Sequence, residues 1–461
     1  MKNPAPPGPR GLPLLGNLLD FRRDPTAFLV GLAREHGDIA HFRLRSQHAY
    51  QLNHPDLIRD VLVTNHRNFV KTRGLERAKR VIGNGLLTSE GEFHLKQRRL
   101  AQPAFARQRI EAYGSAMTAC AAKFSERWSD GRQVDVASEM LRLTLTIVGN
   151  TLFAAETEIN AGEIARAMTV VFEYFNRLMM PFSGLLEVLP LPSRRRFEQA
   201  RALLDSAVYR FIRERRAAGF DAGDLLSKLL FAVDDEGDGT GMTDEQVRDE
   251  IMTMFLAGHE TTATALTWTM YLLATNPQAE AALHRELDEA LEGRLPTVDD
   301  LAQLTCTRMV LAESMRIYPP VWTLTRKALA DYPVAGYVIP AGSIVGMSQY
   351  VMHRDERYYP DPEKFDPLRW TPEEAARRPK YAYFPFGGGP RGCIGEGFAW
   401  MEATLLLATL CQNWKLRVPG GYRPEFQPLI TLRPKNGLPM TVIARRPASH
   451  RTLEQLSHAG S

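Results

Sequence analysis

Stretches in which apolar residues recur every three or four positions dominate the chain between residues 54 and 276. The clearest of these predicted helices span Asp135–Phe153, Ala161–Met180 and Arg194–Ala218. A glycine-rich break at Gly237–Gly241 precedes the longest one, which runs from Thr243 to Ala274. The same pattern predicts further helices at Asp24–His36, Pro277–Glu292, Thr305–Ile317 and Ile394–Gln412.

Segments that look like β-strands are short and lie near the two ends of the chain. They are Ile39–Leu44, His48–Asn53, Val321–Ala328, Tyr337–Ile339 and Ser343–Met347. No Gly/Ser-rich or Pro-rich linker divides the chain. We therefore expect a mainly α fold with small β-sheets, in which residues 1–446 form a single domain. The tail at 447–461 is polar and is expected to be disordered.

The composition excludes several classes of protein. Of the 461 residues, 44% are hydrophobic and 24% charged, as in globular proteins, and a net charge of +4 is too small for nucleic-acid binding by charge alone. No apolar run reaches the ~18 residues of a transmembrane helix, and the proline-rich N-terminus lacks the apolar core of a signal peptide. Four cysteines without paired spacing predict reduced thiols and a cytoplasmic protein without a membrane anchor.

A glycine-rich loop, residues 384–395, places Cys393 at the start of the last predicted helix. The positive end of a helix dipole lowers the pKa of a thiol, and Arg391 adds a full positive charge two residues earlier. A cysteine that is held as a thiolate acts as a nucleophile or as a metal ligand.

Three alternative roles for this loop fit the sequence less well. Gly387, Gly389 and Gly392 match a dinucleotide-binding fingerprint, but Pro390 interrupts it and fewer than ~70 residues remain for the rest of such a domain. A cysteine hydrolase needs a histidine signature that does not accompany Cys393. An inert core cysteine does not require the surrounding glycines and arginine.

Metal binding by one thiolate leaves few options. Zinc and iron–sulfur sites usually take three or four protein ligands, whereas haem needs only one. Haem also needs basic residues to meet its two propionates. Candidates for that role are Arg391, Arg326, His94 and Arg98.

The middle of the longest predicted helix carries the unusual segment 257–262, Ala-Gly-His-Glu-Thr-Thr. Gly258 costs ~1 kcal/mol relative to alanine, and hydroxyl groups can divert the helical hydrogen bonds. One hypothesis is a local distortion that opens a groove, where Glu260 and Thr261 manage protons or a small molecule. The alternative is a simple kink with a solvent-facing glutamate.

A second polar pair interrupts the otherwise apolar predicted helix at residues 305–317. Glu313 and Arg316 are three positions apart and therefore share a helix face. If the pair is buried it needs further partners, and Arg369 is a candidate. We interpret these three residues as a structural clamp and not as a catalytic site.

Taken together, these motifs resemble the cytochrome P450 family of haem-thiolate monooxygenases, in the family's order and over residues 6–444. The cysteine loop matches Phe-x-x-Gly-x-Arg-x-Cys-x-Gly at Phe386, Gly389, Arg391, Cys393 and Gly395. The long helix matches Ala/Gly-Gly-x-Glu/Asp-Thr at Ala257, Gly258, Glu260 and Thr261, and the clamp matches Glu-x-x-Arg with Arg369 as third member. One departure is His94-x-x-x-Arg98, where many relatives have tryptophan at the first position.

The resemblance implies haem b between the long central helix and the helix after the cysteine loop, with Cys393 as the axial ligand of its iron. It implies that Glu260 and Thr261 help deliver protons to dioxygen. It assigns cofactor contacts to Arg391, Phe386, His94, Arg98, Arg326 and Gly395. The implied reaction inserts one oxygen atom into a lipophilic fatty acid, terpenoid, steroid or polyketide, by hydroxylation or epoxidation.

The resemblance also implies partners. Because the chain has no flavin or iron–sulfur motif, electrons are expected from a ferredoxin and its reductase. The protein itself is expected to be a monomer. By analogy the substrate pocket includes Leu86, Phe172, Leu256, Ala257, Val321, Leu324 and Thr431, although apolar segments are equally typical of a core. A haem-binding sensor or carrier without turnover is the alternative.

Overall fold

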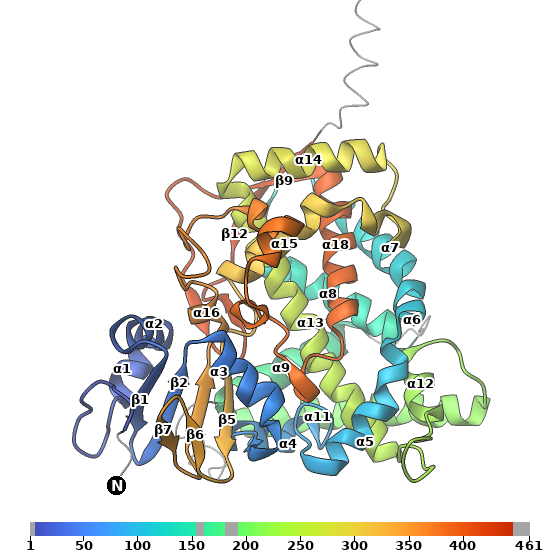
Figure 1. The fold of residues 1–461 in the computed structure, drawn as a ribbon. Helices are drawn as coiled ribbons and strands as arrows, with labels where there is room; N and C mark the ends of the chain where they lie inside the picture. Colours follow the sequence, from blue (N-terminus) through green and yellow to red (C-terminus); the bar gives the residue numbers. More distant parts are fainter. Residues whose placement is uncertain (1–4, 154–160, 180–191, 446–461) are drawn as a thin grey trace, which may run out of the picture. The chain divides into compact units, whose positions relative to one another are not determined.

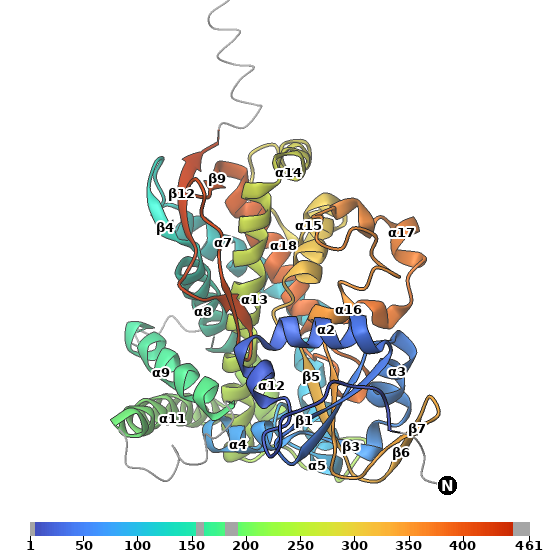
Figure 2. The ribbon, with the colours of Figure 1, turned by 90° about the vertical axis from the view of Figure 1, so that its left-hand side faces the viewer.

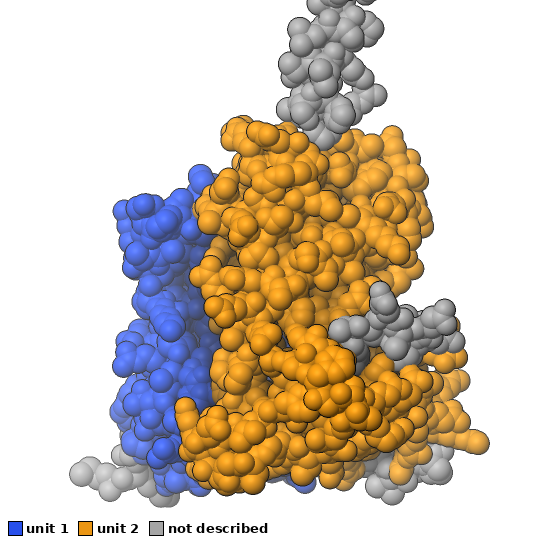
Figure 3. All heavy atoms as spheres, turned by 90° about the vertical axis from the view of Figure 1, so that its right-hand side faces the viewer, with its two compact units in different colours: residues 1–76, 312–393, 426–433 blue, residues 77–311, 394–425, 434–461 orange. Residues whose placement is uncertain are grey.

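The computed structural model describes residues 5–153, 161–179 and 192–445 (Figure 1). These residues form two compact units. The first unit comprises the described residues of Met1–Glu76, Ala312–Cys393 and Phe426–Arg433, and the second those of Arg77–Leu311, Ile394–Glu425 and Pro434–Ser461 (Figure 3). The single domain expected over residues 1–446 therefore stays a prediction. The tail predicted at 447–461 lies outside the described residues.

A five-stranded sheet organises the first unit, with strand order β1-β2-β8-β5-β3. β1 (Ile39–Leu44) and β2 (Gln47–Leu52) form an antiparallel hairpin in which Ile39 lies opposite Leu52. β2 pairs in parallel with β8 (Ile344–Met347), and β8 pairs antiparallel with β5 (Leu324–Ala328). β3 (Phe69–Val70), on the outer edge of β5, is too short to show an alternating pattern, so it escaped prediction.

Short helices surround this sheet. They are α1 (Leu18–Arg23), α2 (Pro25–His36), α3 (Pro55–Arg59), α16 (Gln349–Met352) and α17 (Pro372–Ala376), with the single turns η1 (Asp60–Thr64), η2 (His66–Asn68), η5 (Pro367–Trp370), η6 (Lys380–Ala382) and η7 (Gly389–Arg391). The remaining strands of this unit are β6 (Tyr332–Val334), β7 (Tyr337–Ile339) and β10 (Phe426–Pro428), and β10 pairs with β11 (Leu432–Pro434).

Local sequence explains how α2 begins and where it packs. The Asp24 side chain accepts a hydrogen bond from the N–H of Ala27 at 2.9 Å, and Pro25 occupies the first helical position. Buried Leu29 and Leu32 of α2 then join Phe42 of β1 in one apolar cluster.

The second unit is mostly helical. Its helices are α4 (Arg73–Ile82), α5 (Gly91–Ala101), α6 (Arg107–Ala112), α7 (Gly114–Ser125), α8 (Val136–Phe153), α9 (Ala161–Met179), α11 (Pro192–Ala218), α12 (Leu225–Phe231), α13 (Asp244–Thr275), α14 (Pro277–Leu291), α15 (Thr305–Ile317) and α18 (Glu396–Asn413). The ends of α4 and α15 belong to the first unit. Single turns occur at η3 (Gln102–Phe105) and η4 (Val298–Ala302). A small sheet has the order β4-β12-β9, made of Gln133–Asp135, Pro439–Ala444 and Trp414–Arg417.

Helix α13 is the centre of this unit and packs against α8 and α18, while α9 lies beside α11 (Figures 1 and 2). It begins with a capping box: the Gln246 N–H donates to the Thr243 hydroxyl at 3.2 Å, and the Thr243 N–H donates to the Gln246 side chain at 2.8 Å. Most of its side chains are buried on every face, as expected of a helix at the centre of a core. Among the described residues, no helix combines the length and apolarity needed to cross a membrane.

Candidate active site

The loop before Cys393 is closed by backbone hydrogen bonds within the first unit. The N–H of Cys393 donates to the carbonyl of Phe386 at 2.9 Å, and the N–H of Gly392 donates to the carbonyl of Gly389 at 2.9 Å. Gly389 has φ +65°, and a Cβ there would overlap the carbonyl oxygen of Leu62 in η1. A Cβ on Gly388 would come within 2.6 Å of the Tyr381 ring. Because these glycines lack a side chain, the backbone of the loop contacts η1 and Tyr381 directly.

Cys393 differs from the other three cysteines in its surroundings. It is exposed, whereas Cys120 and Cys306 are partly buried and Cys411 is buried. Burial raises the pKa of Cys411 to about 12 and that of Cys306 to about 11, so both are protonated thiols at neutral pH. An exposed thiol does not agree with an inert core cysteine at position 393.

The donor set fits a cofactor that takes one protein ligand. Among the residues that the structure describes, no three His, Cys, Asp or Glu side chains come together as a metal site. A single thiolate would be sufficient for haem, because the macrocycle itself supplies four nitrogen donors. Zinc and iron–sulfur chemistry, which require more protein ligands, do not fit Cys393.

Several predicted cofactor and pocket residues also belong to the first unit. Arg391 ends η7, and Phe386 is partly buried at the start of the loop. Leu324 of β5 has its Cδ1 3.5 Å from the position of a Cβ on Gly387, so β5 lies beside the cysteine loop. Arg326 follows on the same strand. Val321, which is partly buried, and Thr431, which is buried, complete the predicted residues in this unit.

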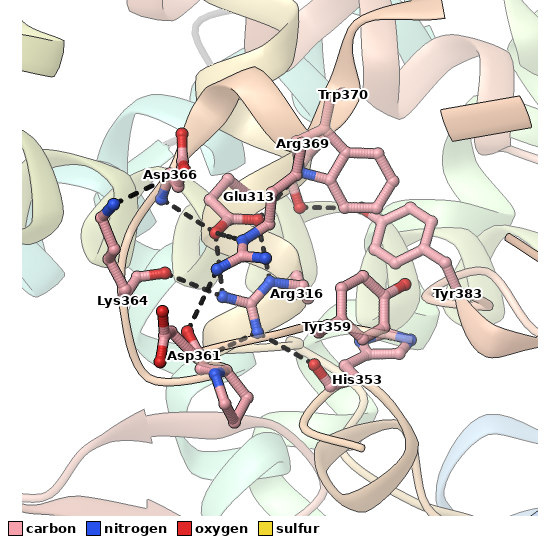
Figure 4. Close-up of polar contacts among 12 residues, drawn as sticks. Glu313, Arg316, His353, Tyr359, Asp361, Lys364, Asp366, Arg369, Trp370 and Tyr383 are labelled. Carbon is pink, nitrogen blue, oxygen red and sulfur yellow. Dashed lines mark hydrogen bonds and ion pairs between the residues drawn. The ribbon is translucent and has the colours of Figure 1, made fainter. Parts of the chain in front are cut away.

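The predicted pair of Glu313 and Arg316 is confirmed and is fully buried (Figure 4). Arg316 donates to both carboxylate oxygens of Glu313 at 2.8 Å. Its remaining donors reach the carbonyls of His353, Pro362 and Lys364 at 2.7–3.2 Å. A buried guanidinium is stable only when its donors are satisfied in this way.

Glu313 binds further partners from the segment that leads to the cysteine loop (Figure 4). It accepts from the N–H of Asp366 at 3.0 Å and from the Trp370 indole at 2.9 Å. Arg369, the predicted third member, lies 3.4 Å from Glu313 as an ion pair and donates to the Asp361 carbonyl at 3.1 Å. The clamp therefore gathers residues 361–370 around one carboxylate.

Aromatic contacts connect the clamp to the base of the cysteine loop. The rings of Trp370 and Tyr383 have centroids 4.3 Å apart, and the Tyr383 hydroxyl donates to the Ala312 carbonyl at 3.0 Å. The N–H of Phe384 donates to Nε2 of His353 at 3.1 Å. Burial, and then the charges of Arg316 and Arg354, lower the pKa of His353 well below 6.5, so the ring stays neutral and can accept this bond.

In the second unit, α5 carries the predicted haem contacts His94 and Arg98. They are four residues apart and share a face, on which His94 is buried and Arg98 partly buried. Lys96 and Arg99 lie on another face of α5 and bind the loop between α12 and α13. Arg99 donates twice to Asp234 at 2.7 Å, and Lys96 donates to Asp238 at 2.6 Å and 2.8 Å. Salt bridges thus fix the orientation of α5.

The polar segment of α13 differs from the hypothesis of a solvent-facing glutamate. The α-helix runs from Asp244 to Thr275 and includes this segment. The hydroxyls of Thr261 and Thr262 donate to the carbonyls of Ala257 and Gly258 at 2.6 Å and 3.2 Å, using lone pairs that the helix leaves unused. Glu260 is only 5% exposed, so it does not face solvent.

His259, between the glycine and the glutamate, is also buried. Its Nδ1 lies 2.7 Å from the Phe255 carbonyl, and burial lowers its pKa to about 4. The ring of Phe172 on α9 contacts it edge-on at 4.7 Å between centroids. Thr144 of α8 donates to the His259 carbonyl at 3.0 Å, which ties α8 to this segment.

Glu402 of α18 is a buried acid that sequence reasoning missed. It is 0% exposed, and no hydrogen bond of normal geometry reaches either carboxyl oxygen. Burial raises its pKa from 4.5 to about 8, and the nearby Thr262 hydroxyl offsets only part of this shift. The available signal was an acidic residue inside the apolar run from Phe398 to Leu410.

The other predicted pocket residues belong to the second unit. Leu256 is buried on α13, Ala257 beside it is exposed, and Phe172 contacts His259. The N–H of Leu86 donates to Glu250 of α13 at 3.1 Å. Glu250 and its neighbour Asp249 were not predicted, because two acidic residues near a helix start usually face solvent.

A mainly helical fold, a single thiol in a glycine-rich loop and an acid–alcohol pair in the longest helix are together typical of haem-thiolate proteins. Comparison with known proteins gives the same class, since a cytochrome P450 family profile matches residues 6–439. Cyclooctatin synthase of Streptomyces melanosporofaciens is 42% identical over 94% of both chains. Cyclooctat-9-en-7-ol 5-monooxygenase of the same organism is 40% identical, over 91% of this chain and 93% of the relative.

Other relatives give the same result. Pentalenene oxygenase of Streptomyces avermitilis is 37% identical over 89% of this chain and 91% of its own. The crystal structure of the cytochrome P450DA haem domain superposes with a TM-score of 0.87 at 28% identity, covering 97% of this chain and all of that one. The chain belongs to the cytochrome P450 family. It is a haem-dependent monooxygenase that uses dioxygen, redox partners and a lipophilic substrate, and the predicted fold is confirmed.

Replacing Arg316 by glutamine should lower the free energy of unfolding by about 3–5 kcal/mol, because it leaves the Glu313 charge buried and unpaired. Arg377→Gln is the matched control, since Arg377 pairs with Glu374 at the same spacing on the surface. It should cost less than about 0.5 kcal/mol. Urea unfolding followed by circular dichroism measures both, and equal midpoints would contradict the structural role.

Cys393→Ser should abolish the red-shifted Soret band that thiolate ligation gives to the reduced, carbon monoxide-bound protein. Cys120→Ser is the control, because a serine hydroxyl can keep the contact that Asn150 makes with Cys120 at 3.2 Å. The control should retain the full band. Retention of the thiolate band in Cys393→Ser would show that another group ligates the iron.

Glu402→Gln should become more stable relative to the parent protein as pH rises from about 5 to about 8. In this window the folded state keeps a proton that the unfolded chain releases. The free energy of unfolding of the parent protein therefore falls by up to about 1.4 kcal/mol per pH unit. The amide cannot ionise and avoids this loss. Exposed Glu396→Gln on the same helix is the control, and parallel stability curves for Glu402→Gln and the parent would refute the buried neutral acid.

Proposed function

We propose that this chain hydroxylates a polycyclic terpenoid. The observation that carries the proposal is its 40% identity, over 91% of its length, to a protein named as cyclooctat-9-en-7-ol 5-monooxygenase. Pentalenene oxygenase, at 37% identity, concerns a second terpenoid. The predicted pocket residues Leu86, Phe172, Leu256 and Leu324 are apolar, as the binding of such a hydrocarbon skeleton requires.

We assign the cofactor contacts as the motifs suggest. When bound, haem supplies the activation of dioxygen, and its iron takes the Cys393 thiolate as its protein ligand. Arg391, Arg326, His94 and Arg98 would hold the propionates. Phe386 would pack near the sulfur, and Gly395 would keep the loop compact. The fixed orientation of α5 supports the roles of His94 and Arg98, because Lys96 and Arg99 are held by salt bridges.

Glu260 and Thr261 would deliver protons. The Thr261 hydroxyl donates to Ala257 within its own helix and can still accept a hydrogen bond through a free lone pair. It is partly exposed, whereas Glu260 next to it is buried. A buried acid beside a partly exposed hydroxyl can pass a proton to a bound small molecule without opening the site to bulk water.

We further propose that a ferredoxin and its reductase supply the electrons and that the enzyme works as a cytoplasmic monomer. The chain carries no flavin or iron–sulfur motif, and its cysteines are free thiols, as in a reducing compartment. Size-exclusion chromatography with light scattering tests the monomer. Comparison of several purified ferredoxins, as reduction rates at low and high salt, tests the partner.

The purified holoenzyme with a surrogate ferredoxin and reductase should convert cyclooctat-9-en-7-ol or pentalenene to a product heavier by one oxygen atom. Thr261→Val should reduce product formation on the order of 100-fold while electron consumption continues as peroxide release. Thr269→Val is the matched control on the same helix, since its hydroxyl also donates to a carbonyl four residues earlier, at 2.7 Å. It should retain normal coupling of product to electrons.

Two outcomes would contradict the proposal in different ways. If terpenoids neither shift the Soret band nor yield product, the substrate class is wrong. If they shift the band and electrons reach the iron but no product forms with any partner, a haem-binding carrier becomes the better description.

A further inference from the structure

The segment between α4 and α5, residues 83–89, is bound to α13 by two adjacent carboxylates. Asp249 accepts a hydrogen bond from the backbone N–H of Asn84 at 2.6 Å. Glu250, which is 0% exposed, accepts from the N–H of Leu86 at 3.1 Å. Side chains of α13 therefore hold this segment by its backbone.

Two glycines bring the segment into direct contact with α13. A Cβ at Gly83, where φ is +76°, would overlap the Asp249 carboxylate. A Cβ at Gly85 would overlap the hydroxyl of Thr253. No side chain fits between the segment and the helix, so the backbone of the segment lies on the helix surface itself.

The segment is also closed by its own hydrogen bonds. The Thr88 hydroxyl donates to the Gly83 carbonyl at 2.7 Å. The N–H groups of Thr88 and Ser89 both donate to the Gly85 carbonyl, at 3.0 Å and 2.9 Å. A turn that satisfies its own backbone has few alternative conformations available.

Charge pairs extend the attachment to α11. Arg248, which is buried, donates to Asp249 at 2.8 Å and to Asp205 of α11 at 2.8 Å. Arg201 of α11 donates to the carbonyl of Arg80, near the end of α4, at 2.8 Å. One network thus joins α4, α11 and α13 around the segment.

The attachment lies on the same face of α13 as the acid–alcohol pair. Thr253, Leu256, Ala257, Glu260 and Thr261 follow the three- and four-residue spacing of a single helix face. Thr253 precedes Thr261 by eight residues, or about 12 Å along the axis at ~1.5 Å per residue. The contact of Gly85 with Thr253 places Leu86 near the beginning of this face.

We infer that Asp249 and Glu250 are positioning residues that make residues 83–89 a fixed wall of the substrate site and thereby set its specificity through Leu86. This inference rests on the proposed function, because it takes Leu86 as a substrate contact. A fixed wall selects substrates by shape, since it does not move to admit a broader skeleton. Any movement that admits substrate must then come from other elements.

Hydrogen exchange in the holoenzyme tests the attachment without a substrate. Glu250→Leu removes the acceptor of the Leu86 N–H, and exchange in a peptide covering residues 83–89 should become about tenfold faster. Glu250→Gln keeps an acceptor oxygen and should change exchange much less. Asp249→Leu is an independent variant that removes the acceptor of the Asn84 N–H and should also accelerate exchange, even if Glu250→Leu does not fold.

Asp244→Asn serves as the control for helix position and charge. Asp244 is a half-exposed residue in the first turn of α13 and pairs with Arg216, away from the segment. Its replacement should leave exchange in residues 83–89 unchanged. If the segment exchanges as fast in the parent protein as in Asp249→Leu, the attachment is refuted.

Azole binding tests the effect on the pocket. The ratio of the dissociation constants of clotrimazole, which is bulky, and imidazole, which is small, is measured by Soret shift. Release of the wall in Glu250→Leu or Asp249→Leu should change this ratio by about tenfold, while Glu250→Gln stays near the parent. Faster exchange with an unchanged ratio would overturn the specificity role. Neither readout needs terpenoid turnover, so a wrong substrate class would leave both results standing.

Discussion

The requirement to satisfy every donor of a buried guanidinium organises the first unit. Arg316 has no access to solvent, and it meets this requirement with one carboxylate and three carbonyls. Those carbonyls belong to residues 353–364, which have almost no regular structure of their own. Because the carboxylate of Glu313 also binds Asp366 and Trp370, an irregular stretch acquires one conformation. The Trp370 ring contacts Tyr383, which immediately precedes the cysteine loop, so the position of this loop depends on the same pair.

Much of this architecture could be predicted where a pattern is long or a motif is specific. The bounds of α8, α9 and α13 agree with the apolar periodicity, since each helix has a buried face over many turns. α18 begins at Glu396, later than predicted, because Gly395 is its N-cap. Strands β3 and β4 escaped prediction because two or three residues carry no periodicity, and they are defined by partners distant in the sequence. The predicted roles of Cys393, Glu260 and Thr261 stay predictions that the family supports.

Acidic side chains that are buried in the folded protein were the hardest to predict. Nothing local distinguishes Glu250 from a surface glutamate, and Glu402 differs from one only by the apolar run around it, because burial depends on which elements pack against the residue. Asp249 and Glu250 are buried by the segment after α4, some 160 residues earlier in the chain. Glu260, in contrast, stood out because a specific motif surrounds it. A polar residue is thus recognised from sequence only when its neighbours are unusual too.

The parallel pairing of β2 with β8 has a consequence for synthesis of the chain. Gln47 donates to the carbonyl of Gly342, a residue 295 positions later. At 5–20 residues per second, roughly 15–60 s pass on the ribosome before this partner exists. During that time the β1–β2 hairpin has an open edge, which is a template for aggregation. Protection of that edge during synthesis, by the ribosome surface or by a chaperone, lowers this risk of aggregation.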